Sequence, residues 1–342
     1  MTNPEPQLSD HDLDRIRDAF QLGSIQTVAY LADGLMNRNW QITTTIGRYA
    51  LKQLLDIPVA TARRNLRVLT ALHQDDVPVC PPLLTRDGDP VIEVSTRAYC
   101  LLSWLDGEHP NGPELTLTQA QRLGTTIGKL HQQLNRHNPP IGLPAITGTP
   151  TARTVQPEQA IAEARRFQTA AQAAGGSFDT TVIDLLDQRI ALIDKHAHAR
   201  PTDNLPKGPY GWTHGDLQHR NVIWTAGRIG AVIDWDRIRV RPFAEEIART
   251  ATIQFGTPDG LDLARVSAFV AGYRTIIPID DADLADGVHR LWWKRMSDFW
   301  HLVFHYDRND RSCDDLFLSG EALLLWWTQH PTEVRHAFTA RG

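Results

Sequence analysis

Cysteine is scarce in this chain: the 342 residues include only Cys80, Cys100 and Cys313, and no two of them form a C-x-x-C pair. This scarcity argues against a disulfide framework or a zinc site, and it is typical of a protein of the reducing cytoplasm. Long apolar runs are absent as well. No stretch reaches the roughly 18 apolar residues of a membrane span, and the first residues are polar and acidic, so we expect neither membrane insertion nor export.

An excess of positive charge is also missing. The formal net charge is -5, whereas a nucleic-acid-binding protein normally carries a basic surface. The remaining composition, 42% hydrophobic and 22% charged, is that of an ordinary globular protein. At this length the chain can form two lobes, each with a core of its own. We therefore expect a cytoplasmic protein that binds neither nucleic acid nor membrane.

The most informative stretch is 211–236, which contains the motifs HGDLQHRN and IDWD. Asp216 stands five residues before Asn221, and Asp234 follows thirteen residues after Asn221. Short apolar segments flank a glycine-bearing turn between them, which predicts a hairpin that returns Asp234 to the side of Asn221. Either motif alone could be a surface turn. Together they fit phosphoryl transfer, with Asp216 as the base and with Asn221 and Asp234 as ligands of Mg²⁺.

The pattern H-G-D-x-x-x-x-N followed by I-D-W resembles the catalytic segment of the aminoglycoside phosphotransferase and choline kinase-like family. Protein kinases carry a related pattern, with Arg in place of Gly215 and D-F-G where this chain has D-W-D. The resemblance implies an α+β, bilobal, protein-kinase-like fold. It assigns residues 1–106 to a small antiparallel β-sheet lobe that binds ATP or GTP, and residues 107–342 to a larger, mostly helical lobe for catalysis and acceptor binding.

Local patterns agree with a β-rich first lobe. The segment 8–22 has Ser9 or Asp10 as a candidate N-cap and apolar residues at helical spacing, which predicts a short helix. β-branched and aromatic residues separated by turn residues then predict three antiparallel strands, at 25–31, 39–45 and 48–55.

The resemblance places the nucleotide site on these strands. Gly34 and Asn37 match the G-x-x-N loop of the family, where a glycine lets backbone amides approach phosphate oxygens. Lys52, on the third strand, corresponds to the lysine that contacts the α and β phosphates. A buried strand follows at 97–107. Its residues Ser103 and Leu105 correspond to the hinge, whose backbone bonds the purine edge.

One departure from the family pattern concerns the partner of Lys52. Relatives place a glutamate for this lysine on the helix that we predict at 60–73, but this segment contains no Glu and has Asn65 at the corresponding position. Either the pair is absent until nucleotide binds, or an acid elsewhere replaces the glutamate. By topology the nearest candidates are Asp33, Asp56 and Glu93. The arginine-rich helix also resembles the branch with type II homoserine kinases and spore-coat kinase-like proteins.

The last hundred residues are helical and rich in aromatic residues. Helical spacing with two apolar faces predicts a buried helix through 291–306. In the family the acceptor lies between the catalytic loop and the C-terminal helices, where acids and aromatics bind amino groups, hydroxyls or ring faces. The candidate acceptor residues are Asp298, His301, Asp307 and Asp310. They predict a cationic or polyhydroxylated acceptor, although a solvated acidic loop would have the same sequence.

These features predict an ATP-dependent kinase that phosphorylates a hydroxyl of an aminoglycoside, a sugar or an aminocyclitol. Only about ten residues separate Asp234 from the next predicted helix, which leaves no room for a protein-kinase activation loop and argues against a protein substrate. Two alternatives remain: an amino-acid or amino-alcohol kinase resembling homoserine or choline kinases, and a pseudokinase that binds nucleotide without turnover. The sequence leaves the oligomeric state open.

Overall fold

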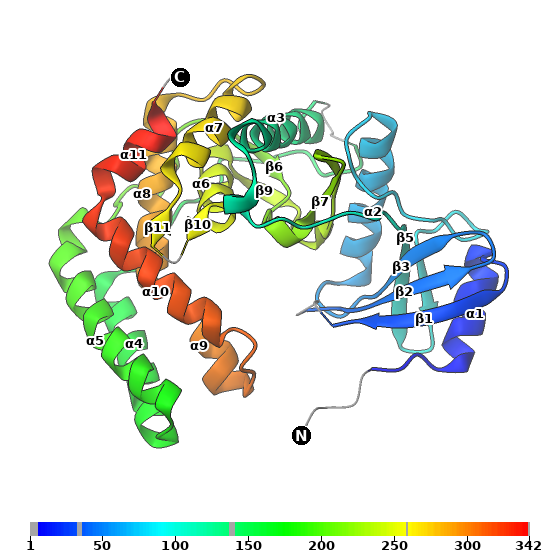
Figure 1. Ribbon diagram of the computed structural model, residues 1–342, viewed down its shortest axis with the longest axis horizontal. Coiled ribbons are helices and arrows are strands. Elements are labelled where there is room, and N and C mark those ends of the chain that lie inside the picture. Colours follow the sequence, from blue (N-terminus) through cyan, green and yellow to red (C-terminus); the bar gives the residue numbers. More distant parts are fainter. Residues whose placement is uncertain (1–5, 33–35, 137–140, 258, 341–342) are drawn as a thin grey trace. The chain divides into compact units, whose positions relative to one another are not determined.

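The computed structural model describes residues 6–32, 36–136, 141–257 and 259–340 (Figure 1). The chain divides into two compact units. The first unit contains Met1–Pro110, Lys129–Ile146 and Trp212–Arg239, and the second contains Asn111–Gly128, Thr147–Gly211 and Val240–Gly342. A single lobe boundary after residue 106 therefore stays a prediction, since the compact units are each assembled from three segments.

The first unit is built on a five-stranded antiparallel sheet with the strand order β1-β2-β3-β5-β4. These strands are β1 (Ile25–Leu31), β2 (Arg38–Thr44), β3 (Arg48–Gln53), β4 (Val91–Val94) and β5 (Arg97–Ser103). The three strands predicted from β-branched and aromatic residues are thereby confirmed. In the sheet register Lys52 lies between Asn39 of β2 and Cys100 of β5, so Lys52 occupies a central strand.

Helix α1 (Asp10–Phe20) covers one side of this sheet. Ser9 is its N-cap, and the Ser9 hydroxyl accepts a hydrogen bond from the Asp12 amide at 3.2 Å. Ile16 and Phe20 turn inward to join Trp40 and the other buried residues of the sheet core. Helix α2 (Val59–Gln74) follows β3 and buries Leu66, Leu69, Leu72 and the polar Asn65.

The predicted hairpin between Asn221 and Asp234 is confirmed. Strand β7 (Val222–Thr225) pairs with β8 (Arg228–Val232) across a turn at Ala226 and Gly227, whose φ angles of 49° and 73° are both left-handed. Beyond the ladder, the Ile233 amide donates to the Asn221 carbonyl at 2.9 Å. This hydrogen bond sets Asp234 next to Asn221. Strand β6 (Tyr210–Thr213) leads into this segment and β9 (Arg239–Pro242) leaves it.

The second unit is mostly helical, so the chain as a whole is α+β. Its helices include α4 and α5, which form an antiparallel pair (green in Figure 1), and α6 packed against α8. The longer elements are α3 (Leu117–Leu134, shared between the units), α4 (Pro157–Ala174), α5 (Ser177–His196), α6 (Phe243–Gln254), α7 (Leu263–Arg274), α8 (Asp281–Ser297), α10 (Asp314–Gln329) and α11 (Pro331–Thr339). The short strands β10 (Gly256–Thr257) and β11 (Gly260–Leu261) pair with each other. None of the helices in the described ranges is long and apolar enough to cross a membrane.

The expected continuous helix through 291–306 is wrong in one respect. Helix α8 ends at Ser297, and the chain resumes as α9 (Trp300–Leu302) and a π-helical turn (Val303–Asp307). The cause is Asp298, whose backbone is extended and whose carboxylate accepts a hydrogen bond from the Trp300 amide at 3.1 Å. A short acid that bonds a backbone amide two residues later competes with the helix. The predicted burial holds for α8, where Trp293 and Met296 are fully buried, but it is wrong beyond the break: Trp300 is 41% exposed, and no residue of Val303–Asp307 is fully buried.

Candidate active site

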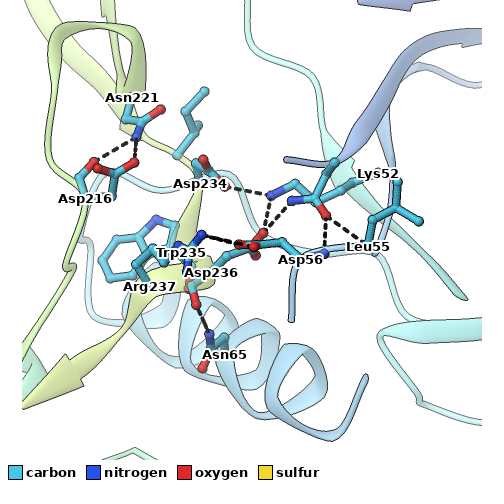
Figure 2. Close-up of polar contacts among 12 residues, drawn as sticks. Lys52, Leu55, Asp56, Asn65, Asp216, Asn221, Asp234, Trp235, Asp236 and Arg237 are labelled. Atoms are coloured by element: carbon cyan, nitrogen blue, oxygen red, sulfur yellow. Dashed lines mark hydrogen bonds and ion pairs between the residues drawn. The ribbon is translucent and has the colours of Figure 1, made fainter. Parts of the chain in front are cut away.

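Lys52 is held by two carboxylates in the first unit. Its ammonium nitrogen lies 2.7 Å from Asp234 Oδ1 and 3.0 Å from Asp236 Oδ2 (Figure 2). Burial alone would lower the pKa of Lys52, but the two carboxylates outweigh burial and raise it above its ordinary value. Lys52 is therefore a permanent cation, placed beside the residue that we predict to bind metal.

Two of the acids predicted as partners of Lys52 form ion pairs with other residues. Asp56 pairs with Arg237 at 2.7 Å, and Glu93 pairs with Arg63 at 2.8 Å, while Asp33 lies outside the described residues. The prediction for Asp56 and Glu93 was wrong, as was the alternative of an unpaired lysine. Asp236 was missed as a partner, although its position two residues after Asp234 in the D-W-D motif was a visible signal.

Asp234 has an unusual backbone conformation, with φ 63° and ψ 67°. A left-handed non-glycine residue is held in place by its surroundings. Here the Trp235 indole donates to the Val232 carbonyl at 2.8 Å and meets the His214 ring edge to face at 4.6 Å. Burial raises the pKa of Asp234, but the Lys52 ammonium lowers it more, and the net result is a pKa below its usual range. The carboxylate is thus ionised at neutral pH.

Asn65 anchors this turn from α2. Its side chain is 2% exposed, and Nδ2 donates to the Trp235 carbonyl at 2.9 Å and to the Asp236 carbonyl at 3.4 Å (Figure 2). Its Oδ1 accepts two hydrogen bonds from the Arg64 guanidinium, at 2.8 and 3.1 Å. The helix on which the family pattern predicted a lysine-binding glutamate therefore binds the backbone of the acidic turn instead.

Asn37 lies at the end of the expected nucleotide loop, and both the nitrogen and the oxygen of its side-chain amide form hydrogen bonds. Nδ2 donates to Asp236 Oδ2 at 2.8 Å, and Oδ1 accepts from the Leu55 amide at 2.9 Å. Asn37 thus holds the carboxylate of Asp236, while Asn65 bonds its backbone carbonyl. A direct role for Asn37 with phosphates stays a prediction, and Gly34, its partner in the motif, lies outside the described residues.

The loop with the predicted base is shaped by internal hydrogen bonds. Asn221 Nδ2 donates to the Asp216 carbonyl at 2.8 Å and lies 3.4 Å from Asp216 Oδ2. The Asp216 amide donates to His214 Nδ1 at 3.2 Å, so the proton of His214 resides on Nε2, which donates to the Ile233 carbonyl at 3.0 Å. His214 thus ties the loop to the strand that leads to Asp234.

Gly215 is required by this geometry. Its φ is +85°, and a Cβ added there would lie 2.0 Å from the Arg237 carbonyl oxygen. No side chain fits between the two segments, which explains the glycine in the H-G-D motif.

The predicted metal ligands offer hard oxygen donors. The side-chain nitrogen of Asn221 donates a hydrogen bond to Asp216, and Asp234 Oδ1 accepts one from Lys52. Among the described residues, no hydrogen bond engages Asn221 Oδ1 or Asp234 Oδ2. Carboxylate and amide oxygens suit Mg²⁺, so this donor set fits the ion. In the same ranges of the chain, no group of three or more His, Cys, Asp or Glu residues offers another metal centre.

The two predicted hinge residues differ in what they can offer. The Ser103 amide already donates to the Pro81 carbonyl at 3.1 Å. Leu105 makes no backbone hydrogen bond with any described residue, so both its N–H and its C=O remain for a ligand. Its side chain packs on the apolar cluster around Ile223 and Ala231, which is suited to a flat aromatic ring. Leu105 therefore fits a hinge role better than Ser103 does.

The four candidate acceptor residues lie in the second unit, and three of them are acids with partners there. Asp298 accepts from the Trp300 amide, Asp307 pairs with Arg166 at 2.9 Å, and Asp310 accepts from the Ser312 amide at 2.9 Å.

His301, the fourth candidate, packs against Trp300 with the two rings tilted by 30° and their centroids 3.9 Å apart. Burial, with smaller effects from Arg295 and Arg189, lowers the pKa of His301 to about 4. A role in acceptor binding stays a prediction for each of the four candidates, Asp298, His301, Asp307 and Asp310.

Comparison with known proteins finds a matching family and several relatives. The model of the Phosphotransferase enzyme family matches residues 27–279. The homoserine kinase of Pseudomonas aeruginosa is 26% identical over 255 residues, which cover 74% of this chain and 73% of that enzyme.

Two solved structures share the fold. An amicoumacin kinase in complex with AMP-PNP and Ca²⁺ has a TM-score of 0.62 at 17% identity, covering 95% of this chain and 94% of that one. A microcompartment-associated aminopropanol kinase has a TM-score of 0.60 at 18% identity, covering 96% and 100%. The predicted α+β, protein-kinase-like fold is confirmed.

Proposed function

This chain belongs to the phosphotransferase enzyme family and is a small-molecule kinase, and we propose that it transfers the γ-phosphoryl group of ATP to an acceptor hydroxyl. The observation that carries the proposal is the pairing of Lys52 with Asp234 and Asp236 beside the Asp216–Asn221 loop. The first unit thus contains one cation, one carboxylate that we propose to bind metal and one candidate base. These are the parts that phosphoryl transfer requires.

Asp216 is the proposed general base. Its backbone is fixed by Asn221 and His214, and Gln218 Nε2 lies 3.3 Å from Asp216 Oδ2. A carboxylate held in this way can orient the acceptor hydroxyl and take its proton as the bond to phosphorus forms. Because the acceptor is itself the nucleophile, no covalent enzyme intermediate is needed.

Lys52 is proposed to bind the α and β phosphates. The contacts with Asp234 and Asp236 keep it charged and aimed while the site is without nucleotide. Asn221 and Asp234 would hold Mg²⁺, which neutralises charge on the phosphate oxygens when bound. The backbone N–H and C=O of Leu105 supply one donor and one acceptor for the purine edge. Because both are backbone groups, the identity of the side chain does not indicate whether the nucleotide is ATP or GTP.

Two acceptor classes compete. The solved structures with this fold include a spectinomycin phosphotransferase, which agrees with the expected antibiotic class, and an aminopropanol kinase, which agrees with the alternative of an amino-alcohol kinase. The similarity to homoserine kinase, which extends over 74% of the chain, favours a hydroxylated amino acid. The intact set of Asp216, Asn221 and Asp234 speaks against a pseudokinase.

The test is acceptor-dependent ADP formation. Purified protein with Mg²⁺ and ATP is given a panel of L-homoserine, aminopropanol, choline, sugars and aminocyclitol antibiotics, beside the Asp216→Asn variant. We expect at least one acceptor to stimulate ADP formation by the wild type and none to stimulate the variant. ATP binding in a thermal shift assay with no stimulation by any acceptor would instead support the pseudokinase.

A further inference from the structure

The two carboxylates that contact Lys52 are held by their surroundings in different ways. Asp236 Oδ2 accepts a hydrogen bond from Asn37 Nδ2 at 2.8 Å, beside the one from the Lys52 ammonium at 3.0 Å. The carbonyl oxygen of Asp236 also lies 3.4 Å from Asn65 Nδ2 of α2 (Figure 2). The side chain of Asp236 is only 14% exposed. Its position is therefore set by Asn37 and Asn65 as well as by Lys52.

Asp234 is held less firmly than Asp236. Its side chain is 42% exposed, and among the described residues the Lys52 ammonium, 2.7 Å from Oδ1, is the one hydrogen-bond donor to its carboxylate. Asp234 is also the residue that we propose to bind Mg²⁺ together with Asn221. The carboxylate that contacts Lys52 in this structure is thus the one that a divalent cation requires.

Lys52 and a metal ion compete for Asp234 because both are cations. An ammonium 2.7 Å from Asp234 Oδ1 offsets the charge of the carboxylate and repels a divalent ion there. Nucleotide phosphates carry negative charge that attracts both cations, so the repulsion falls when phosphate oxygens accept the N–H groups of Lys52. A cavity of about 30 Å³, lined by Lys52, Asp234 and Asp236 among other residues, leaves the ammonium room to shift.

We propose that Lys52 blocks the metal position of the nucleotide-free site, and that nucleotide opens this position by drawing Lys52 away from Asp234; this inference rests on the phosphotransferase function proposed above. Asp236 keeps its contact with Lys52 during the exchange, because its own place is fixed by Asn37 and Asn65. Asp236 is then the positioning residue of Lys52. Metal and nucleotide should each strengthen the binding of the other by the same factor.

The first test measures Mn²⁺ binding without nucleotide, by electron paramagnetic resonance of the unbound ion. In Lys52→Met the competing cation is gone, and we expect the Kd for Mn²⁺ to fall at least about tenfold below that of the wild type. Lys129→Met, which removes an exposed lysine of α3, should leave this Kd within about twofold. Asp234→Asn added to Lys52→Met should abolish the gain in affinity, whereas Asp236→Asn should retain most of it.

The fold of the lysine variant is checked in parallel. Lys52→Met leaves Asp234 and Asp236 without their common cation, so circular dichroism and the Tm are recorded for it. Lys52→Gln, which retains a hydrogen-bond donor but no charge, is measured beside it and should show the same gain in Mn²⁺ affinity.

The second test measures the coupling between metal and ADP, which binds without turnover. The Kd for Mn²⁺ is determined with and without saturating ADP. For the wild type we expect ADP to tighten Mn²⁺ binding at least about tenfold. In Lys52→Met the factor should be smaller, because the metal position is already open without nucleotide.

A third measurement isolates the role of Asp236 through metal-free ADP binding. Asp236→Asn alone should weaken ADP binding several-fold, since Lys52 is then held by Asp234 only. In the Lys52→Met background the same substitution should weaken it by less than about twofold, because Asp236 acts through Lys52. A merely structural role of Asp236 would lower ADP affinity equally in both backgrounds.

The outcomes separate this inference from the proposed function, since none of these measurements involves turnover. Folded Lys52 variants that bind Mn²⁺ no more tightly than the wild type overturn the proposal. So does a loss of the gain on Asp236→Asn, which would make Asp236 the metal ligand, or an equal effect of Asp236→Asn on ADP binding in both backgrounds. Coupling of Mn²⁺ to ADP through Lys52 without any acceptor-stimulated ADP formation would sustain the inference while the kinase function fails.

Discussion

Asn65 Nδ2 lies 2.9 Å from the carbonyl oxygen of Trp235, and this hydrogen bond joins α2 to the turn that carries Asp234 and Asp236. From the family pattern we expected an acid for the strand lysine at this helix position. Here the helix bonds the backbone, and the acids of the turn bond the lysine. The orientation of Lys52 is therefore controlled by α2 indirectly, through the geometry of residues 234–236.

Replacing Asn65 with Leu should raise the KM for ATP several-fold and lower kcat. The change leaves the buried carbonyl of Trp235 without a donor, which costs about 1–3 kcal/mol, and releases the turn that aims Asp234. Steady-state kinetics at saturating acceptor and urea unfolding measure the two effects. Arg67→Gln, at an exposed position of the same helix, is the control. Unaltered kinetics in Asn65→Leu would show that the turn is held without α2.

Asp216→Asn should reduce kcat by a factor of about 100 or more, because the variant cannot accept the hydroxyl proton. Binding of Mg-ATP should stay within a few-fold, since Asp216 is not among the proposed nucleotide contacts. Single-turnover assays and nucleotide titration measure the two quantities. Asp184→Asn, an exposed acid of α5, controls for the loss of a charge. A variant that keeps more than about a tenth of kcat would remove Asp216 from the role of base.

Asp234→Ala should weaken Mg²⁺-dependent nucleotide binding at least about tenfold, because one metal ligand and one partner of Lys52 are lost together. The measurement is the Mg²⁺ concentration at half-maximal ATP binding. Asp236→Ala removes a partner of Lys52 but none of the predicted metal ligands, so it should change this midpoint less. Equal midpoints in the wild type and Asp234→Ala would place the metal elsewhere.

His301 should make the protein sensitive to mild acid. Its pKa in the folded state is about 4, below the roughly 6.5 of an unfolded chain. The unfolded state then binds the proton more readily, so stability is complete above about pH 6.5 and is lost as the pH falls toward 4. Thermal unfolding at pH 7 and pH 5 should show a smaller loss of Tm in His301→Gln than in the wild type. His73→Gln, at an exposed histidine, should leave the difference unchanged.

Local patterns were sufficient for the sheet, for the hairpin and for the grouping of Asn221 with Asp234. Alternating apolar residues and turn glycines are short-range signals, and they fix which residues become neighbours along a strand pair. The binding roles of these residues are still predictions, since geometry alone does not show a bound ligand.

The partners of Lys52 could not be derived in the same way. Asp236 reaches the lysine because Asp234 adopts a left-handed backbone, and the turn is held by Asn65 and Asn37, which come from distant segments and bond Trp235 and Asp236. The break at Asp298 was missed for a similar reason. Apolar spacing through 291–306 is helical, and only the hydrogen bond of one short acid interrupts it.

The backbone of Asp234 has a consequence for protein engineering. At φ 63° a side chain costs about 1–2 kcal/mol relative to glycine, so the backbone taken alone favours glycine at this position. The same replacement deletes the carboxylate that faces Lys52. Selection for heat resistance and selection for turnover thus act in opposite directions on a single residue. A library screened only for thermal tolerance should lose the kinase here first.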